Sequence, residues 1–128
     1  MTYEEASAYI EEIPKFTEKH SLAYIRDFLE RLGNPGLDRK IIHVAGIVIG
    51  REQIDNGKFL AVFEQVKATV DGMAADGVSH PSYFEFLFGM AMVAFERADV
   101  EYIILETGMG GRLDATNAVE RPAVTVIT

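Results

Sequence analysis

The sequence has no cysteine, no tryptophan and few basic residues. Its 128 residues include 12 Lys and Arg against 20 Asp and Glu, so the formal net charge is −8. Without cysteine the chain can form neither disulfides nor thiolates, as is usual for proteins of the reducing cytoplasm. The excess of acidic side chains argues against binding to nucleic acid or to an anionic membrane surface, because both require a cationic surface. We therefore expect a cytoplasmic protein with neither as a partner.

The sequence predicts neither a membrane span nor a signal peptide. The longest uncharged apolar stretch, residues 86–95, is flanked by Glu85 and Glu96, and it is much shorter than the roughly 20 residues that a spanning helix needs. The sequence starts with two early glutamates and no basic residue, unlike a signal peptide. With 48% hydrophobic and 25% charged residues, the composition is that of one folded domain.

Two residue pairs have the spacing of a helix capping box, in which each partner satisfies a free N–H group at the start of a helix. The first pair, Thr2 and Glu5, predicts a helix that ends before Pro14. The second pair, Ser82 and Glu85, precedes a helix that is apolar on nearly all sides. Such a pattern predicts a central helix, covered by other elements on several faces.

Two further helices are indicated by apolar stripes at helical spacing. One begins near Ser21 and is terminated by residues 33–36, and the other is capped by Asp55 or Asn56 and ends at Gly77. Both helices are amphipathic, and neither stripe by itself indicates a catalytic or binding site. The stripes are Leu22, Ile25, Phe28, Leu29 and Leu32 in the first helix and Phe59, Phe63, Val66, Val70 and Met73 in the second.

Continuous apolar runs at residues 41–46, 102–105 and 123–127 are typical of strands buried on both faces of a parallel sheet. Alternation of such strands with helices predicts an α/β fold. A further strand-like run, residues 47–50, touches the first without a connector, although parallel neighbours need a crossover of about a dozen residues. Either this run pairs antiparallel through a tight bend, or a segment is missing between the two runs.

A glycine-rich stretch at residues 105–117 contains the strongest candidate for chemistry. Glu106 directly follows a predicted buried strand, and glycines 108, 110 and 111 allow a close backbone approach to a ligand. Ligands of α/β sheets collect beyond the carboxyl ends of the strands, and a carboxylate there suits Mg²⁺. The alternative is a structural loop in which Glu106 pairs with Arg112. The spacing alone favours neither interpretation.

A phosphate-binding P-loop is absent from the sequence. That loop requires Gly, four residues, and then Gly-Lys-Ser/Thr, but the chain has Arg51 and Glu52 where Gly46 would require Gly-Lys. Six residues separate Gly50 from Gly57, and Phe59 stands where the hydroxyl residue should be. We therefore assign no nucleotide-binding residue and no catalytic residue.

Five segments of the sequence resemble the N-terminal part of the folylpolyglutamate synthase/dihydrofolate synthase family, within the Mur ligase superfamily. The last of them, Gly-Gly-Arg-Leu-Asp-Ala-Thr-Asn, is close to a signature of that family. The resemblance implies an incomplete P-loop-type central domain with a mostly parallel sheet and flanking helices. The five segments are residues 2–6, 32–35, 42–46, 83–86 and 110–117.

The resemblance also implies that a piece of the family's domain is missing. In the family, the strand ending in His-Val-Ala-Gly continues into Thr-Asn-Gly-Lys-Gly-Ser, the ATP-binding loop, whereas here Gly46 is followed by Ile47. The match stops at Thr128, before the rest of the ATPase domain and the glutamate-binding domain. We therefore expect one truncated domain over residues 1–128, with a helical segment at 1–40 and an α/β part with an internal deletion at 41–128.

Roles for individual residues follow from the same resemblance. Glu106 matches a ligand of Mg²⁺ in the family. In the pterin-contacting segments, aromatic rings would stack on the pterin and carboxylates would accept its N–H groups. The alternatives are core packing for Tyr83 and Phe84 and a turn role for Asp114. The matching pterin-contacting residues are Ser82, Tyr83, Phe84, Glu85, Leu113, Asp114 and Ala115.

The implied activity is ATP- and Mg²⁺-dependent addition of glutamate to folate or dihydropteroate. Without the P-loop we expect this chain to be inactive alone and to bind neither cofactor tightly. The alternative is a non-catalytic module that binds a pterin or self-associates, since a deletion exposes a flank that a second copy of the chain would cover. The three histidines, His20, His43 and His80, share no metal-ligand spacing, and we give them little weight.

Overall fold

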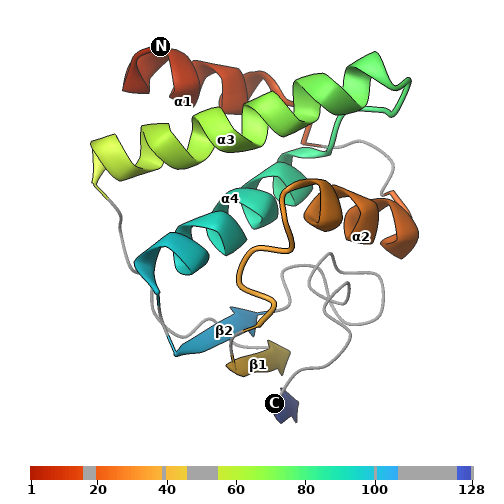
Figure 1. Ribbon diagram of the computed structural model, residues 1–128, viewed down its shortest axis with the longest axis vertical. Coiled ribbons are helices and arrows are strands. Elements are labelled where there is room, and N and C mark those ends of the chain that lie inside the picture. Colours follow the sequence, from red (N-terminus) through yellow and green to blue (C-terminus); the bar gives the residue numbers. More distant parts are fainter. Residues whose placement is uncertain (16–19, 39, 46–54, 100, 107–123, 128) are drawn as a thin grey trace.

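The computed structural model describes residues 1–15, 20–38, 40–45, 55–99, 101–106 and 124–127. Within these ranges two helices precede the first strand, two more helices precede the second strand, and a third strand follows it (Figure 1). None of the described helices is long and apolar enough to cross a membrane. The elements are α1 (Tyr3–Glu12), α2 (Leu22–Arg31), β1 (Lys40–Ala45), α3 (Asn56–Ala75), α4 (Tyr83–Ala98), β2 (Tyr102–Glu106) and β3 (Val124–Ile127).

The helices start where the capping residues are. Both predicted capping boxes are present, Thr2 with Glu5 at the start of α1 and Ser82 with Glu85 at the start of α4. Of the two candidates for the cap of α3, the structure selects Asp55, whose Oδ1 accepts the backbone N–H of Lys58 at 2.8 Å. In each case a side-chain oxygen satisfies an N–H group that the helix itself leaves free.

Two helices end at glycines with a positive φ. At the end of α2, Gly33 (φ 93°) donates its N–H to Glu30 and Asn34 donates to Leu29, and this pair of bonds defines a Schellman motif. At the end of α3, Gly77 (φ 77°) and Val78 make the equivalent bonds. The predicted stops at residues 33–36 and at Gly77 are therefore confirmed.

The three strands form a parallel sheet in the order β2-β1-β3. The central strand pairs Ile42 with Ile104 on one side and with Val124 on the other. All three carboxyl ends therefore lie along the same edge of the sheet, and Glu106 is the last residue of β2. The side chains of these strands lie outside the described part of the structure, apart from that of Ile103, which is buried.

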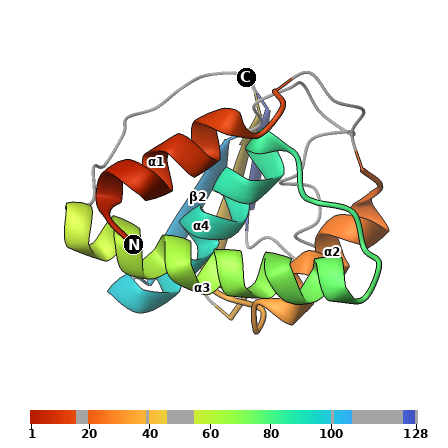
Figure 2. The same ribbon diagram turned by 90° about the horizontal axis from the view of Figure 1, so that it is seen from above.

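Helix α4 lies between the sheet and the pair formed by α1 and α3 (Figures 1 and 2). On one side, Phe88 and Met92 of α4 pack with Ile103 of β2 and with two residues of α2. On its other sides, Phe86 and its neighbours join the larger cluster with α1, α2 and α3. The prediction of a central helix covered on several faces is confirmed, and the described part of the chain is layered as an α/β fold requires.

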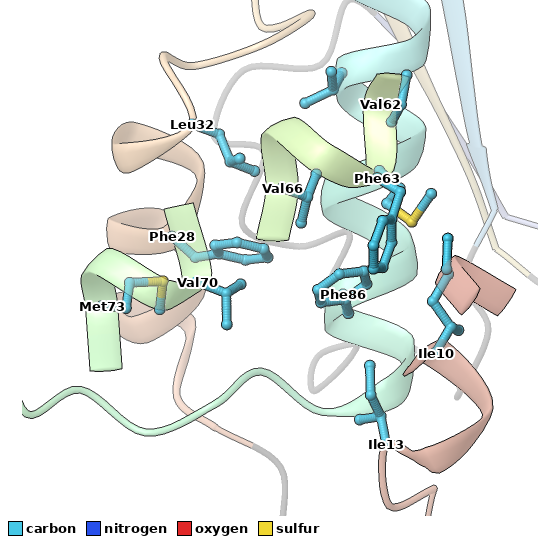
Figure 3. Close-up of a cluster of buried hydrophobic side chains, with 13 residues drawn as sticks. Ile10, Ile13, Phe28, Leu32, Val62, Phe63, Val66, Val70, Met73 and Phe86 are labelled. Carbon is cyan, nitrogen blue, oxygen red and sulfur yellow. The ribbon is translucent and has the colours of Figure 1, made fainter. Parts of the chain in front are cut away.

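The larger core cluster is aromatic at its centre (Figure 3). The rings of Phe63 and Phe86 lie 5.8 Å apart between their centroids, and both side chains are fully buried. Phe28 of α2 reaches the same cluster over Gly89 of α4. A Cβ at Gly89 would lie 2.8 Å from two atoms of the Phe28 ring, so the absence of a side chain there permits the close approach of α2 to α4.

The segment that would hold the internal deletion, residues 46–54, lies outside the described residues. The same is true of residues 107–123, which include most of the glycine-rich stretch. The strand-like run at 47–50 and its two alternative explanations therefore stay predictions.

Candidate functional site

A cavity of about 480 Å³ lies where the end of α1 meets the start of α4. Its walls come from α1 (Tyr9 and Glu12), from Ile13 and Pro14 just beyond it, from His20, and from residues 80–82. Ser82, the N-cap of α4 and a predicted pterin contact, is one of these lining residues. The cavity therefore borders the first turn of α4, where four of the predicted site residues lie.

Glu85 is the most strongly held residue of that turn. Its side chain is buried, although it is ionisable, and the residue is only 4% exposed. Oε1 accepts the backbone N–H of Ser82 at 2.8 Å and lies 2.6 Å from Nδ1 of His20, while Oε2 accepts the backbone N–H of His20 at 3.3 Å. Both carboxylate oxygens are thus engaged within the protein. The role of Glu85 as a pterin contact stays a prediction.

The two aromatic residues of the turn differ in exposure. Phe84 is 52% exposed, so the alternative of core packing is wrong for this ring. Tyr83 is partly buried and packs against the larger core cluster, with Nζ of Lys15 lying 4.8 Å from its ring centroid. The two rings meet edge to face at 5.3 Å. Phe84 is therefore the ring of this turn that offers an open surface for stacking.

His20 is fixed from three directions. Besides its contacts to Glu85, its Nε2 lies 2.9 Å from Oγ of Ser79, and its ring stacks on that of Tyr24 with centroids 3.8 Å apart. The hydroxyl of Tyr24 donates to the carbonyl oxygen of Ser79 at 2.5 Å. Burial raises the pKa of Tyr24 well above its usual value, and the nearby carboxylates of Glu85 and Asp27 raise this pKa further.

His80 makes a second, separate connection at the cavity. Its Nδ1 lies 2.7 Å from the carbonyl oxygen of Pro81, which can only accept, so Nδ1 carries the hydrogen. In the neutral ring Nε2 then accepts the hydroxyl of Tyr9, which lies 2.7 Å away. Burial is the main cause that raises the pKa of Tyr9. This bond ties α1 to the segment that leads into α4.

Sequence reasoning missed both histidines. His20 and His80 are far apart in the chain, and neither has the spacing of a metal ligand, yet both line the same cavity. A weak signal was available, because His20 directly precedes the N-cap Ser21 and His80 lies two residues before the N-cap Ser82. A histidine one or two residues before an N-cap is therefore a candidate for contacts with distant segments of the chain.

The remaining predicted site residues are only partly described. Glu106 ends β2 at the carboxyl edge of the sheet, but its side chain lies outside the described part, as do Leu113, Asp114 and Ala115 entirely. Among the described side chains, no group of three or more His, Asp or Glu residues could hold a metal ion. Whether the chain can hold Mg²⁺ therefore depends on Glu106 and on residues that the structure does not describe.

Comparison with curated proteins gives consistent relatives. The whole chain aligns at 30% identity with a probable bifunctional folylpolyglutamate synthase/dihydropteroate synthase of Halobacterium salinarum. It also aligns over 98% of its length, at 29% identity, with the dihydrofolate synthase/folylpolyglutamate synthase of Bacillus subtilis. The chain belongs to the folylpolyglutamate synthase/dihydrofolate synthase family. The resemblance seen in the sequence is thereby confirmed, although no family model matches the chain.

Solved structures of this family have the same fold. A mutant of the Lactobacillus casei folylpolyglutamate synthase, 23% identical, superposes over 99% of this chain and 40% of its own, with a TM-score of 0.85. A complex named as folylpolyglutamate synthase with AMPPCP and folate gives 0.84 at 23% identity over the same shares. At these identities the likeness establishes the α/β fold of the family.

The chain is much shorter than its family relatives. It spans 20% of the Halobacterium protein and 38% of the Bacillus protein. The alignment with the first has 165 positions, which exceeds the 128 residues of this chain by 37. At least that many aligned positions therefore have no residue here. The alignment with the Bacillus protein, over 163 positions, shows a similar excess.

Proposed function

We propose that this chain is a family member that retains a pterin-binding surface but lacks the phosphate-binding loop, so that it binds dihydropteroate or folate without ligating glutamate. The observation that carries the proposal is at the sequence level: the strand that ends at Gly46 continues into Ile47, and no Gly-x₄-Gly-Lys-Ser/Thr run occurs anywhere in the chain. The 37 or more unmatched positions in the family alignment support an internal deletion. We place it after Gly46.

Loss of that loop would remove the main source of catalysis. In ATP-dependent amide ligation, a carboxylate of the pterin substrate takes the γ-phosphoryl group and the amine of glutamate then attacks the acyl phosphate. Positioning and charge stabilisation by loop amides, a lysine and Mg²⁺ dominate such phosphoryl transfer. Removing even one stabilising donor lowers the rate by about 10²–10³, so a missing loop should abolish turnover.

The pterin-binding part of the proposal rests on the first turn of α4. Phe84 presents a 52% exposed ring next to Ser82, which borders the cavity. A flat heteroaromatic ring stacks well on such a surface. We propose that Leu113, Asp114 and Ala115 complete the pterin site and that Glu106 is the residual Mg²⁺ ligand. One carboxylate alone would hold neither Mg²⁺ nor Mg-ATP tightly.

Titration calorimetry tests this proposal with dihydropteroate, folate and Mg-ATP as separate ligands. We expect heat from at least one pterin and none from Mg-ATP. Phe84→Ala should weaken pterin binding about two- to twelvefold, because ring stacking contributes about 0.5–1.5 kcal/mol. The matched control is Tyr3→Ala, another exposed aromatic residue (36%) at the opposite end of α1 from the cavity, and it should leave the affinity unchanged. No heat from either pterin would refute the proposal.

The alternative is a module that self-associates. In the described sheet, β2 and β3 are the outer strands, each paired only with β1. Strands at the edge of a sheet are usually covered, and a second copy is a common cover. Under this alternative the chain forms a homo-oligomer in the cytoplasm whether or not a pterin binds.

A further inference from the structure

We propose that His20 is a positioning residue for the pterin-facing turn of α4 and that it acts through the buried carboxylate of Glu85. The inference rests on the proposed function and assigns a role to a residue that sequence patterns left without one. It also changes the expected role of Glu85, from a group that contacts the pterin to one that orients its neighbours.

The geometry around Glu85 carries the first step. Three N–H groups point at its carboxylate, and two of them belong to His20: the ring Nδ1 at 2.6 Å and the backbone N at 3.3 Å. The third is the backbone N–H of Ser82 at 2.8 Å. The side chain of Glu85 is only 5% exposed, so its carboxylate has little access to water and protein donors must replace its hydration. Nδ1 of His20 makes the shortest of these contacts.

The ring of His20 is itself held in place, and this is the second step. It stacks on Tyr24 of α2 with an interplanar angle of 15°, and its Nε2 lies 2.9 Å from Oγ of Ser79. Tyr24 in turn donates to the carbonyl oxygen of Ser79. The donor that reaches Glu85 is therefore anchored on α2 and on the segment before α4, not on α4 itself.

The position of Glu85 in the capping box gives the consequence. Glu85 accepts the N–H of Ser82 and donates its own backbone N–H to Oγ of Ser82 at 3.3 Å. These reciprocal bonds set the direction of the first turn, and the two residues between them, Tyr83 and Phe84, take their orientation from it. If the carboxylate lost its contact to the His20 ring, it would turn toward water and open the capping box. The exposed ring of Phe84 would then lose its fixed direction.

Three substitutions at one position separate positioning from simple stabilisation. His20→Asn places an amide N–H one bond from Cγ, where Nδ1 is, and so keeps a donor for Glu85. His20→Gln places the amide one bond farther, near the position of Nε2, and His20→Ala removes both ring contacts. Thr2→Ala is the matched control, because it breaks the other capping box, at the start of α1, and leaves the contact between Nδ1 of His20 and Glu85 in place.

Two measurements are made on each folded variant: the exchange rate of the Ser82 amide by NMR, without ligand, and the Kd for dihydropteroate by calorimetry. We expect His20→Ala and His20→Gln to raise both quantities about tenfold, corresponding to a lost bond at a buried charged group. His20→Asn and Thr2→Ala should stay within about twofold of the unsubstituted chain. Rescue by Asn but not by Gln is the result that a merely stabilising role would not produce.

The outcomes separate the two proposals. If the unsubstituted chain binds no pterin, the proposed function fails, and the exchange rates alone still decide whether His20 positions the turn. If pterin binds but His20→Ala changes neither quantity, the positioning role of His20 is refuted. That role is also refuted if His20→Asn and His20→Gln give equal exchange rates and equal Kd values. It is refuted as well if Kd simply follows the melting temperature across the four variants.

Discussion

Gly89 on α4 and Gly72 on α3 allow the packing of α2 against α4 to be tested with the same substitution at two places. Both lie inside helices, and in both Gly→Ala gains about 0.5–1 kcal/mol of helix stability. A Cβ at Gly72 meets nothing within 4 Å, whereas at Gly89 it meets the buried ring of Phe28 at 2.8 Å and Cδ1 of Leu32 at 3.2 Å. Overpacking of this kind costs about 1–3 kcal/mol.

The gain in helix stability is the same for both substitutions. The difference between their changes in unfolding free energy therefore measures the steric cost alone. We expect Gly72→Ala to stabilise the chain by about 0.5–1 kcal/mol and Gly89→Ala to destabilise it by about 1 kcal/mol net. Urea unfolding followed by circular dichroism gives both values, provided that the dependence on denaturant is the same in the two variants. Equal changes of the same sign in the unfolding free energy would show that α2 does not approach α4 over Gly89, and the described core would be wrong.

Further predictions concern pH, helix capping and assembly. Since burial raises the pKa of Tyr24 above its usual value of 10.0, the unfolded chain loses this proton first as the pH rises. The stability that this group contributes is thus complete below about pH 10 and is lost above it. Tyr24→Phe should flatten the fall in unfolding free energy above about pH 10, and an unchanged slope there would contradict the assignment. Thr2→Ala removes the acceptor for the N–H of Glu5 and should cost about 0.5–2 kcal/mol in urea unfolding, so a loss below about 0.2 kcal/mol would argue against the capping box. Light scattering at high concentration should show a homo-oligomer if a second copy covers an outer strand of the described sheet, and a strict monomer would refute that expectation.

Local features of the fold could be predicted from the sequence because their causes are local. A capping residue and its partner are three positions apart, and a glycine stop acts on the turn that precedes it, so Ser82, Glu85 and Gly77 were sufficient to predict where helices begin and end. The apolar character of α4 likewise predicted its central place, since a helix without a polar face must be covered.

The site was less accessible, because it depends on contacts between distant segments. Glu85 could be assigned to a capping box, but its contact with His20 requires the segment between α1 and α2 to fold back onto the start of α4. Nor could the pattern distinguish Tyr83 from Phe84. The two are neighbours on one turn, and only the surrounding packing partly buries Tyr83 and leaves Phe84 exposed.

The central claim is that a family member without the phosphate-binding loop cannot complete the ligation. The most direct measurement is ADP release by the pure chain in the presence of dihydropteroate or folate, glutamate and Mg-ATP, compared with the Glu106→Ala variant. The account predicts the same background rate for both proteins with either pterin. Pterin-dependent ADP release by the unsubstituted chain, above that of Glu106→Ala, would contradict it.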